Sequence, residues 1–219
     1  MCGRIANTLP TDAMAQLFAA RPANNLPKIP NFNICPTDQL HVVSLNDGRR
    51  HLDAMRWGFL PHWYKTPDDG PLLINTRAET IADKPAFRSA CRNRRCLIPI
   101  TGFYEWTKDD AGNRLPWYIS CRDDAPLALA GVWQSWAQGD VVMRSCAVVT
   151  TGANKAMSSI HHRMPVVLAK ADWPLWLGEA GKGAATLMTA APEEALRFWR
   201  VDSKVNSNRA SGAELIEAL

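Results

Sequence analysis

The sequence predicts an α+β fold built on a curved, barrel-like and mainly antiparallel β-sheet that a few helices flank. Three observations support this prediction. Eight short segments have the composition of β-strands, whereas helical periodicity is confined to four stretches. No segment repeats at a fixed period, and no low-complexity run divides the chain. Residues 1–219 are therefore expected to form a single domain.

The expected elements follow from local signals in chain order. Thr11 and Asp12 can cap a helix that runs to about residue 20, before Pro22. Residues 21–36 contain several prolines and asparagines, which predicts an irregular connection. Residues 107–113 have the composition of a hairpin loop. The expected strands are 41–45, 51–57, 95–100, 102–107, 115–120, 127–133, 141–150 and 164–168, and the other expected helices are 79–90, 170–177 and 192–198.

The composition is that of an ordinary soluble globular protein, with 47% hydrophobic and 21% charged residues. The formal charge of +4 is too small to indicate a nucleic-acid partner by itself. The six cysteines form no CxxC pair and no zinc-site spacing with histidines, so we expect reduced thiols and no metal or cofactor. Without a secretory leader or a long apolar run, a cytoplasmic location away from membranes is expected, associated with the nucleoid if the source is bacterial.

Cys2 follows the initiator methionine directly. Removal of Met1 would leave Cys2 with a free α-amino group beside its thiol. These groups titrate at roughly 7.7 to 8.0 and about 8.5, so both have a reactive form at cellular pH. Such a terminus can capture an aldehyde as an imine and then as a thiazolidine, or can act as base and nucleophile in acyl transfer. Alternatively Cys2 is incidental, and a retained Met1 would abolish this chemistry.

Residues 74–80 place an amide and a guanidinium at the start of a helical pattern. Asn75 could orient a reacting carbonyl or amine, because its side chain both donates and accepts hydrogen bonds. Arg77 could clamp a phosphate. The alternative is an asparagine helix cap followed by a solvated arginine.

Glu105 lies between Tyr104 and Trp106 on an expected strand. Burial beside aromatic rings disfavours a charged carboxylate, so the pKa of Glu105 would rise and the side chain could shuttle protons. The alternative is an amphipathic strand on which Glu105 faces water.

His161 and His162 precede Arg163 and an apolar strand. A histidine near its ordinary pKa can act as an acid or as a charged partner for a developing alkoxide. Neighbouring residues on an extended chain point to opposite sides, so only one of these histidines is expected to enter a given site. No carboxylate or cysteine is near them in the sequence, so we expect no metal there.

Aromatic residues are frequent between Trp57 and Tyr64. Exposed aromatic rings near arginine offer a stacking surface for unpaired bases, worth roughly 1 to 3 kcal/mol per base. Most of the nine tryptophans, among them Trp173, Trp176 and Trp199, are instead expected to pack against helices.

Taken together, these segments resemble the SOS-response-associated peptidase (SRAP) family of abasic-site processing proteins. The chain departs from the usual family pattern at Cys35, where most members have alanine before the proline, and in a longer spacer after Trp63. The motifs that carry the resemblance run in family order over nearly the whole length: Cys2-Gly3-Arg4, Asn33-Ile34-Cys35-Pro36, Arg56-Trp57-Gly58, Ile74 to Thr80, Gly102 to Trp106, Thr150 to Asn154, Ile160 to Pro165 and Val201 to Asn206.

The resemblance implies a monomer that binds single-stranded DNA at abasic sites and forms a thiazolidine cross-link with the deoxyribose aldehyde, which shields the lesion. It implies that Cys2 is the nucleophile and that Asn75 positions the opened sugar and the amine. Glu105 would transfer protons, and His161, rather than His162, would assist ring opening. An autocatalytic thiol peptidase with lyase-like chemistry is also implied. The implied DNA-binding residues are Arg4, Asn33, Pro36, Trp63, Tyr64, Arg77 and Arg163.

Two other functions remain open from the sequence. In an N-terminal-nucleophile amidohydrolase, Cys2 would attack a side-chain amide. In a non-covalent binding module, arginines and aromatic rings would grip unpaired DNA and Cys2 would have no chemical role.

Overall fold

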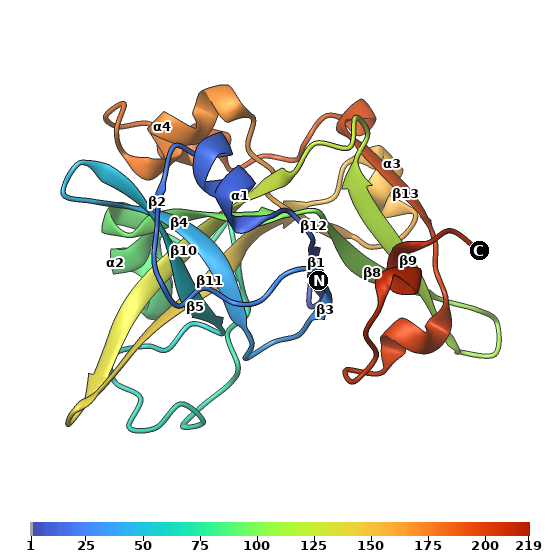
Figure 1. Cartoon of the computed structure of the whole chain (residues 1–219), viewed down its shortest axis with the longest axis horizontal. Helices are drawn as coiled ribbons and strands as arrows, with labels where there is room; N and C mark the ends of the chain where they lie inside the picture. The colour runs from blue at the N-terminus through green and yellow to red at the C-terminus, as the bar shows by residue number, and fades with distance from the viewer. Residues whose placement is uncertain (1) are drawn as a thin grey trace.

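The structure is a computed structural model that describes residues 2–219 (Figure 1). Its core is two β-sheets. The strands are β1 (Ile5–Asn7), β2 (Arg21–Pro22), β3 (Asn31–Ile34), β4 (Gln39–Asn46), β5 (Arg49–Trp57), β6 (Asn75–Arg77), β7 (Arg95–Ile100), β8 (Gly102–Lys108), β9 (Arg114–Cys121), β10 (Leu127–Gln138), β11 (Val141–Gly152), β12 (Arg163–Pro165) and β13 (Leu196–Arg200). The α-helices are α1 (Thr11–Leu17), α2 (Pro85–Asn93), α3 (Lys155–Ser158) and α4 (Trp173–Leu177).

The larger sheet closes on itself. Its strands follow the order β12-β11-β10-β7-β4-β5-β2, and β11 pairs in addition with β5 and β6. Strands β4, β5, β7, β10 and β11 therefore form a closed ring, which removes their free edges. Most pairs are antiparallel, and the parallel ones are β11 with β5, β11 with β6, and β2 with β5. This confirms the predicted α+β class with a barrel-like, mainly antiparallel core.

The smaller sheet has the order β13-β9-β8-β1-β3, and all of its pairs are antiparallel. In Figure 1 it lies to the right of the barrel, and α1, α2 and α4 lie around the barrel at the left. Alternation along the strands explains this arrangement, because successive side chains point to opposite faces. One face of the barrel strands joins Ile5, Ile34 and Phe103 of the smaller sheet in a shared core, and the other face packs against the helices.

Two predicted helices begin later than expected, since Lys170–Asp172 form a 3-10 turn before α4. The predicted helix 79–90 begins only at Pro85, because a residue before proline is disfavoured in helical conformation and Lys84 is extended. Residues 79–84 form turns instead. Helix α4 ends at Leu177 as predicted, and the cap residue Gly178 has a φ of 94°, which suits a glycine in the left-handed region.

The predicted helix 192–198 is wrong. Residues Glu193–Ala195 form a short 3-10 turn, and β13 begins at Leu196. Strand β13 pairs with β9, with Trp199 opposite Tyr118 and their rings 5.3 Å apart. Cross-strand aromatic packing therefore outweighs the weak helical pattern of this segment.

The irregular connection predicted for residues 21–36 is also partly wrong, because it contains β2 and β3. Strand β3 pairs with β1, which local signals did not predict, with Ile5 opposite Ile34. The expected strand 164–168 is shorter as β12, and only an isolated bridge from Val167 to Leu129 continues it. The other predicted strands and the loop between β8 and β9 are present, with β10 and β11 longer than expected.

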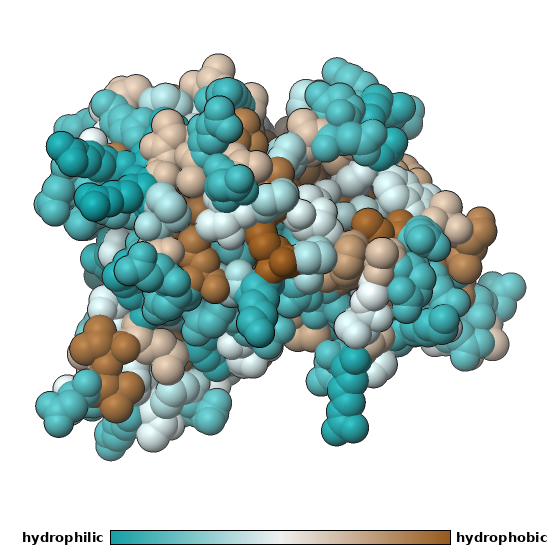
Figure 2. All heavy atoms as spheres, in the orientation of Figure 1, coloured by the Kyte–Doolittle hydropathy of each residue, from teal (hydrophilic) through white to brown (hydrophobic). Residues whose placement is uncertain are grey.

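In the view of Figure 2 hydrophilic residues cover most of the surface, and apolar residues form small separate areas. The exposed large apolar side chains of the described chain include Val141 and Val142 at the turn between β10 and β11. None of the helices in residues 2–219 has the length and apolar character needed to cross a lipid bilayer.

Candidate functional site

Cys2 lies at the junction of the two sheets. It comes just before β1 and belongs to the shared core, where its side chain is 0% exposed. Burial, together with the carboxylate of Glu105, holds the pKa of the Cys2 thiol above its ordinary value. The thiol is therefore neutral at physiological pH. The question whether Met1 is removed lies outside the described residues.

Glu105 reaches the same place from strand β8. Antiparallel pairing sets Ile5 of β1 opposite Phe103, so the chain that precedes Ile5 runs back alongside Glu105. The side chain of Glu105 is 3% exposed and shares the inward face of β8 with Phe103. Burial is the main reason that its pKa is raised, and the charge of His162 opposes the rise. Of the two orientations left open by the sequence, the structure shows the buried one.

Asn75 begins strand β6, which runs parallel to β11 with Asn75 opposite Val148. Its Nδ2 donates a hydrogen bond of 2.8 Å to the carbonyl oxygen of Cys2. Its buried Oδ1 has no hydrogen-bond partner among residues 2–219. Asn75 therefore holds the start of the chain in place and keeps one acceptor unused, and it is not a helix cap.

The two histidines lie on a bend between α3 and β12. The expectation that they point to opposite sides is wrong, because their rings stack with centroids 4.4 Å apart and an interplanar angle of 24°. The alternation rule requires an extended chain, and residue 162 is in a bend. Burial lowers the pKa of His161, and of the two histidines it is His162 whose electrostatic effect reaches Glu105.

Arg163 was predicted to contact phosphate, and the structure places it in an ion pair with Glu79. Its Nη1 and Nη2 lie 2.6 and 2.9 Å from the two carboxylate oxygens, and Nη2 also donates to the Thr150 carbonyl at 2.7 Å. The side chain of Arg163 is 12% exposed.

A groove beside Asn75 contains two of the predicted DNA-binding residues. This cavity of about 550 Å³ is lined by Trp63, which is 47% exposed, and by the exposed Arg77. Lys84 and Phe87 also line it, and local sequence reasoning missed both. Lys84 lies next to the N-terminus of α2, and successive turns, in which the N–H of Thr80 donates to the Arg77 carbonyl and the N–H of Lys84 donates to the Thr80 carbonyl, bring it to the same groove as Asn75.

The other predicted DNA-binding residues are not equally accessible. Tyr64 is 7% exposed, and its hydroxyl donates to the Pro71 carbonyl. Pro36 is half-buried in the turn after β3.

Arg4 and Asn33 hold the C-terminal segment. Nη1 of Arg4 donates to Asn33 Oδ1 at 2.5 Å and to the Val205 carbonyl at 2.8 Å. Nδ2 of Asn33 donates to the carbonyls of Ser207 and Ala210. Both side chains are therefore engaged within the protein in this structure.

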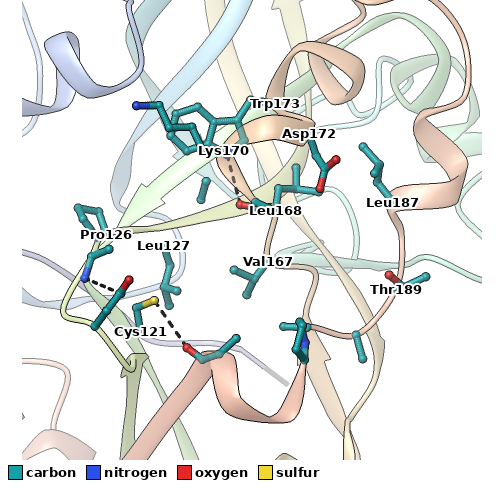
Figure 3. Close-up of a pocket in the computed structure, with 18 of the residues that line it drawn as sticks. Cys121, Pro126, Leu127, Val167, Leu168, Lys170, Asp172, Trp173, Leu187 and Thr189 are labelled. Atoms are coloured by element: carbon teal, nitrogen blue, oxygen red, sulfur yellow. Dashed lines mark hydrogen bonds between the residues drawn. The ribbon is translucent and has the colours of Figure 1, made fainter.

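A larger cavity, of about 620 Å³, lies elsewhere and contains none of the predicted site residues (Figure 3). Leu127, Val167 and Leu187 are among its mostly apolar lining, with Lys170 and Asp172 drawn near them. No cluster of three or more potential metal ligands exists within residues 2–219. Cys2 and Glu105, by contrast, are buried neighbours that each have a raised pKa, and burial and the charge of Glu105 together raise that of Cys2.

The chain was compared with known proteins. The model of the SOS response associated peptidase (SRAP) family matches residues 1–208. The chain is 35% identical over 195 residues to Abasic site processing protein YoaM of Bacillus subtilis, with 86% of this chain and 85% of the relative covered. It is 29% identical to Abasic site processing protein YedK of Escherichia coli, with 99% of each covered.

Solved structures share the fold. An X-ray structure of a Bacteroides thetaiotaomicron protein superimposes with a TM-score of 0.87 at 21% identity, over 100% of both chains. A phage-related protein from Bordetella bronchiseptica superimposes with a TM-score of 0.73 at 28% identity, over 91% of this chain and 94% of the other. With the family model spanning almost its whole length, this chain belongs to the SOS response associated peptidase (SRAP) family.

Proposed function

We propose that this protein binds single-stranded DNA at abasic sites and forms a covalent thiazolidine cross-link through Cys2 after removal of Met1. The observation that carries the proposal is the convergence of Asn75 and Glu105 on the first residues of the chain, through the 2.8 Å hydrogen bond to Cys2 and the burial of both Cys2 and Glu105. The names of the relatives, which are abasic site processing proteins, support the choice of substrate.

The chemistry begins with an aldehyde. An abasic deoxyribose is mostly a closed hemiacetal, and it must open before an amine can react. His161 assists this step by donating a hydrogen bond from its ring N–H to the ring oxygen, while solvent water carries the anomeric hydroxyl proton to that oxygen. The α-amine of Cys2 then adds to the aldehyde carbon to give a carbinolamine, which loses one water to become an imine. Glu105 donates and accepts the protons of these steps.

The sulfur acts second. Because burial and Glu105 raise the pKa of the thiol, Cys2 keeps its proton while the amine attacks. The sulfur then adds to the imine carbon, the S–H proton passes to nitrogen, and a five-membered ring closes. The net change is the loss of one water. Amine and thiol belong to one residue, so ring closure has the high effective molarity of an intramolecular reaction.

Asn75 and the groove give this reaction its geometry. The unused Oδ1 of Asn75 accepts a hydrogen bond from the reacting amine or from an opened sugar hydroxyl. Arg77 and Lys84 neutralise backbone phosphates along the groove, and Trp63 stacks on an unpaired base. The same terminus accounts for self-processing, in which water cleaves the peptide bond between Met1 and Cys2.

Intact mass spectrometry tests the proposal. The purified protein should lack the mass of Met1, and after mixing with an abasic single-stranded oligonucleotide it should gain the oligonucleotide mass minus one water. Cys2→Ala should form no stable adduct yet still bind undamaged single strands. A stable thiazolidine-like adduct in Cys2→Ala, or in protein with Met1 retained, would disprove the mechanism. Absence of any adduct in the wild type would favour the non-covalent binding module.

A further inference from the structure

The ion pair between Arg163 and Glu79 joins two parts of the site. Both oxygens of Glu79 are engaged, at 2.6 Å from Nη1 and 2.9 Å from Nη2. The two residues are 84 positions apart in the chain, and hydrogen bonding to Arg163 is the main reason that the pKa of Glu79 is lowered. A bidentate ion pair between arginine and a carboxylate fixes the plane of the guanidinium group as well as its position.

The ion pair between Arg163 and Glu79 lies beside Thr150 of strand β11. Strand β6 pairs with β11 with Arg77 opposite Thr150, and β12 pairs with β11 with Arg163 opposite Gly152. The Thr150 carbonyl accepts from the backbone N–H of Ala78 at 2.8 Å and from Nη2 of Arg163 at 2.7 Å. The ion pair thus ties the strand that starts with Asn75 to the strand that follows the histidines.

The backbone of Arg163 also touches the imidazole of His161. Its N–H lies 3.0 Å from Nδ1, and its carbonyl oxygen lies 3.2 Å from the same atom. The two contacts are alternatives, because a backbone N–H only donates and a carbonyl oxygen only accepts. We base the inference on the shorter one, which places a lone pair on Nδ1. In a neutral ring the proton is then on Nε2, and burial favours the neutral ring by lowering the pKa of His161.

We propose that Glu79 is a positioning residue, which holds Arg163 so that His161 keeps one orientation and carries its ring proton on Nε2. The inference rests on the proposed function of His161, because the N–H fixed at Nε2 is the hydrogen-bond donor that His161 directs at the sugar oxygen. Glu79 itself is 51% exposed and acts only through Arg163. A His161 imidazole that is held in one orientation loses less conformational entropy when the reactive geometry forms.

Glu79→Gln tests this inference, because it keeps the side-chain shape and removes the charge. The pair between Arg50 and Glu179 provides a matched control, since it is also two-pronged, with both distances 2.7 Å, and is not part of the site. Glu179→Gln should therefore lose a similar surface contact without consequences for His161.

The first readout is the tautomer, which does not depend on DNA. Long-range ¹H–¹⁵N spectra of the free protein distinguish protonated from unprotonated ring nitrogens for each of the five histidines, and His161→Gln assigns the signals. We expect a protonated Nε2 for His161 in the wild type and in Glu179→Gln, and a mixture of tautomers in Glu79→Gln. A protonated Nδ1 in the wild type, or an unchanged His161 spectrum in Glu79→Gln, overturns the inference.

The second readout is the rate of cross-linking to an abasic oligonucleotide. We expect Glu79→Gln to be slower by roughly threefold to thirtyfold, which is less than the ~100-fold that a misplacement of about 1 Å can cost. Glu179→Gln should match the wild type. A tautomer change without a slower rate would uphold the positioning of His161 and count against its role in linkage. A slower rate without a tautomer change would overturn the positioning role of Glu79.

Discussion

At the scale of single residues, burial controls the proton chemistry of the site. Cys2 and Glu105 are both almost fully enclosed, and burial is the largest cause of the raised pKa of each. A neutral thiol and a carboxyl group that keeps its proton to higher pH suit a reaction in which the amine attacks first and protons are exchanged stepwise. The site thus uses a dry interior to adjust ordinary side chains.

We expect Glu105→Gln to slow cross-link formation by about 10²-fold or more, which is the usual contribution of general acid–base catalysis. Protonation of the Cys2 α-amine lowers the rate as the pH falls in both proteins. Because the pKa of Glu105 is raised, the wild type should show a further fall as the pH decreases toward that value, and Glu105→Gln should lack this further fall. Single-turnover gel assays over a range of pH measure both effects. Binding of undamaged single strands should stay near the wild-type value, and an equal loss of binding would mark Glu105 as structural.

The same shift has a consequence for stability. The pKa of Glu105 is higher in the folded protein than in the unfolded chain. The protonated side chain is therefore no burden to the fold at low pH, and the free energy of unfolding decreases as the pH rises through the folded pKa. Glu105→Gln should therefore have a higher free energy of unfolding than the wild type at neutral pH, and the difference should vanish in acid. Urea unfolding at several pH values checks this sign.

His41 changes the pH dependence of stability in the opposite direction to Glu105. It is 2% exposed, neither ring nitrogen has a hydrogen-bond partner within residues 2–219, and burial lowers its pKa from 6.5 to about 4. As the pH falls, the histidine takes up a proton in the unfolded chain before it does so in the folded protein. The free energy of unfolding therefore decreases between pH 6.5 and the folded pKa, by about 3 kcal/mol in all.

We therefore expect His41→Leu to remove this acid-side loss in unfolding titrations. The exposed His62 is a suitable control, and His62→Leu should keep the wild-type pH dependence. If His41→Leu were to lose stability in acid as steeply as the wild type, the buried neutral state of His41 would be wrong.

At the scale of elements, three very short strands position the site. Strand β1 delivers Cys2, β6 delivers Asn75, and β12 follows the two histidines. Each has only three residues, too few for local periodicity to predict them. Their hydrogen bonds come from strands distant in the sequence, so tertiary pairing and not propensity makes them strands.

The C-terminal segment, residues 203–210, is held by the hydrogen bonds of one side chain on a short strand. Asn33 of β3 donates to the carbonyls of Ser207 and Ala210 and accepts from Arg4. Asn33→Ala should loosen residues 203–210 by roughly 1 to 3 kcal/mol, because buried backbone and guanidinium groups would lose partners. Hydrogen exchange should report faster exchange there. If exchange is unchanged while single-strand binding weakens, Asn33 serves DNA and not the fold.

At the scale of the whole molecule, the position of individual cations matters more than the net charge. The net charge of +4 is small, and several arginines are already paired with carboxylates, including Arg50, Arg144 and Arg163. Arg77 and Lys84 are the cations that line the groove proposed to bind DNA.

Arg77→Ala should weaken binding to undamaged single strands and reduce the slope of log K against log salt by about 0.7, because one fewer phosphate is neutralised. Fluorescence anisotropy over a series of salt concentrations measures this slope. Arg144, which pairs with Asp53 outside the groove, provides the control. An unchanged slope in Arg77→Ala, or an equal change in Arg144→Ala, would contradict the assignment of the groove.

The sequence by itself determined the fold class, the longer strands, the loop between β8 and β9 and the family, because these depend on local alternation, turn residues and ordered motifs. Only the tertiary structure decided that β13 is a strand, that the histidine rings stack, and that Arg163 binds Glu79. It also placed Glu105 inside and Tyr64 largely out of reach of solvent. The physical reason is that burial and hydrogen bonding depend on partners far along the chain, which no local pattern of residues records.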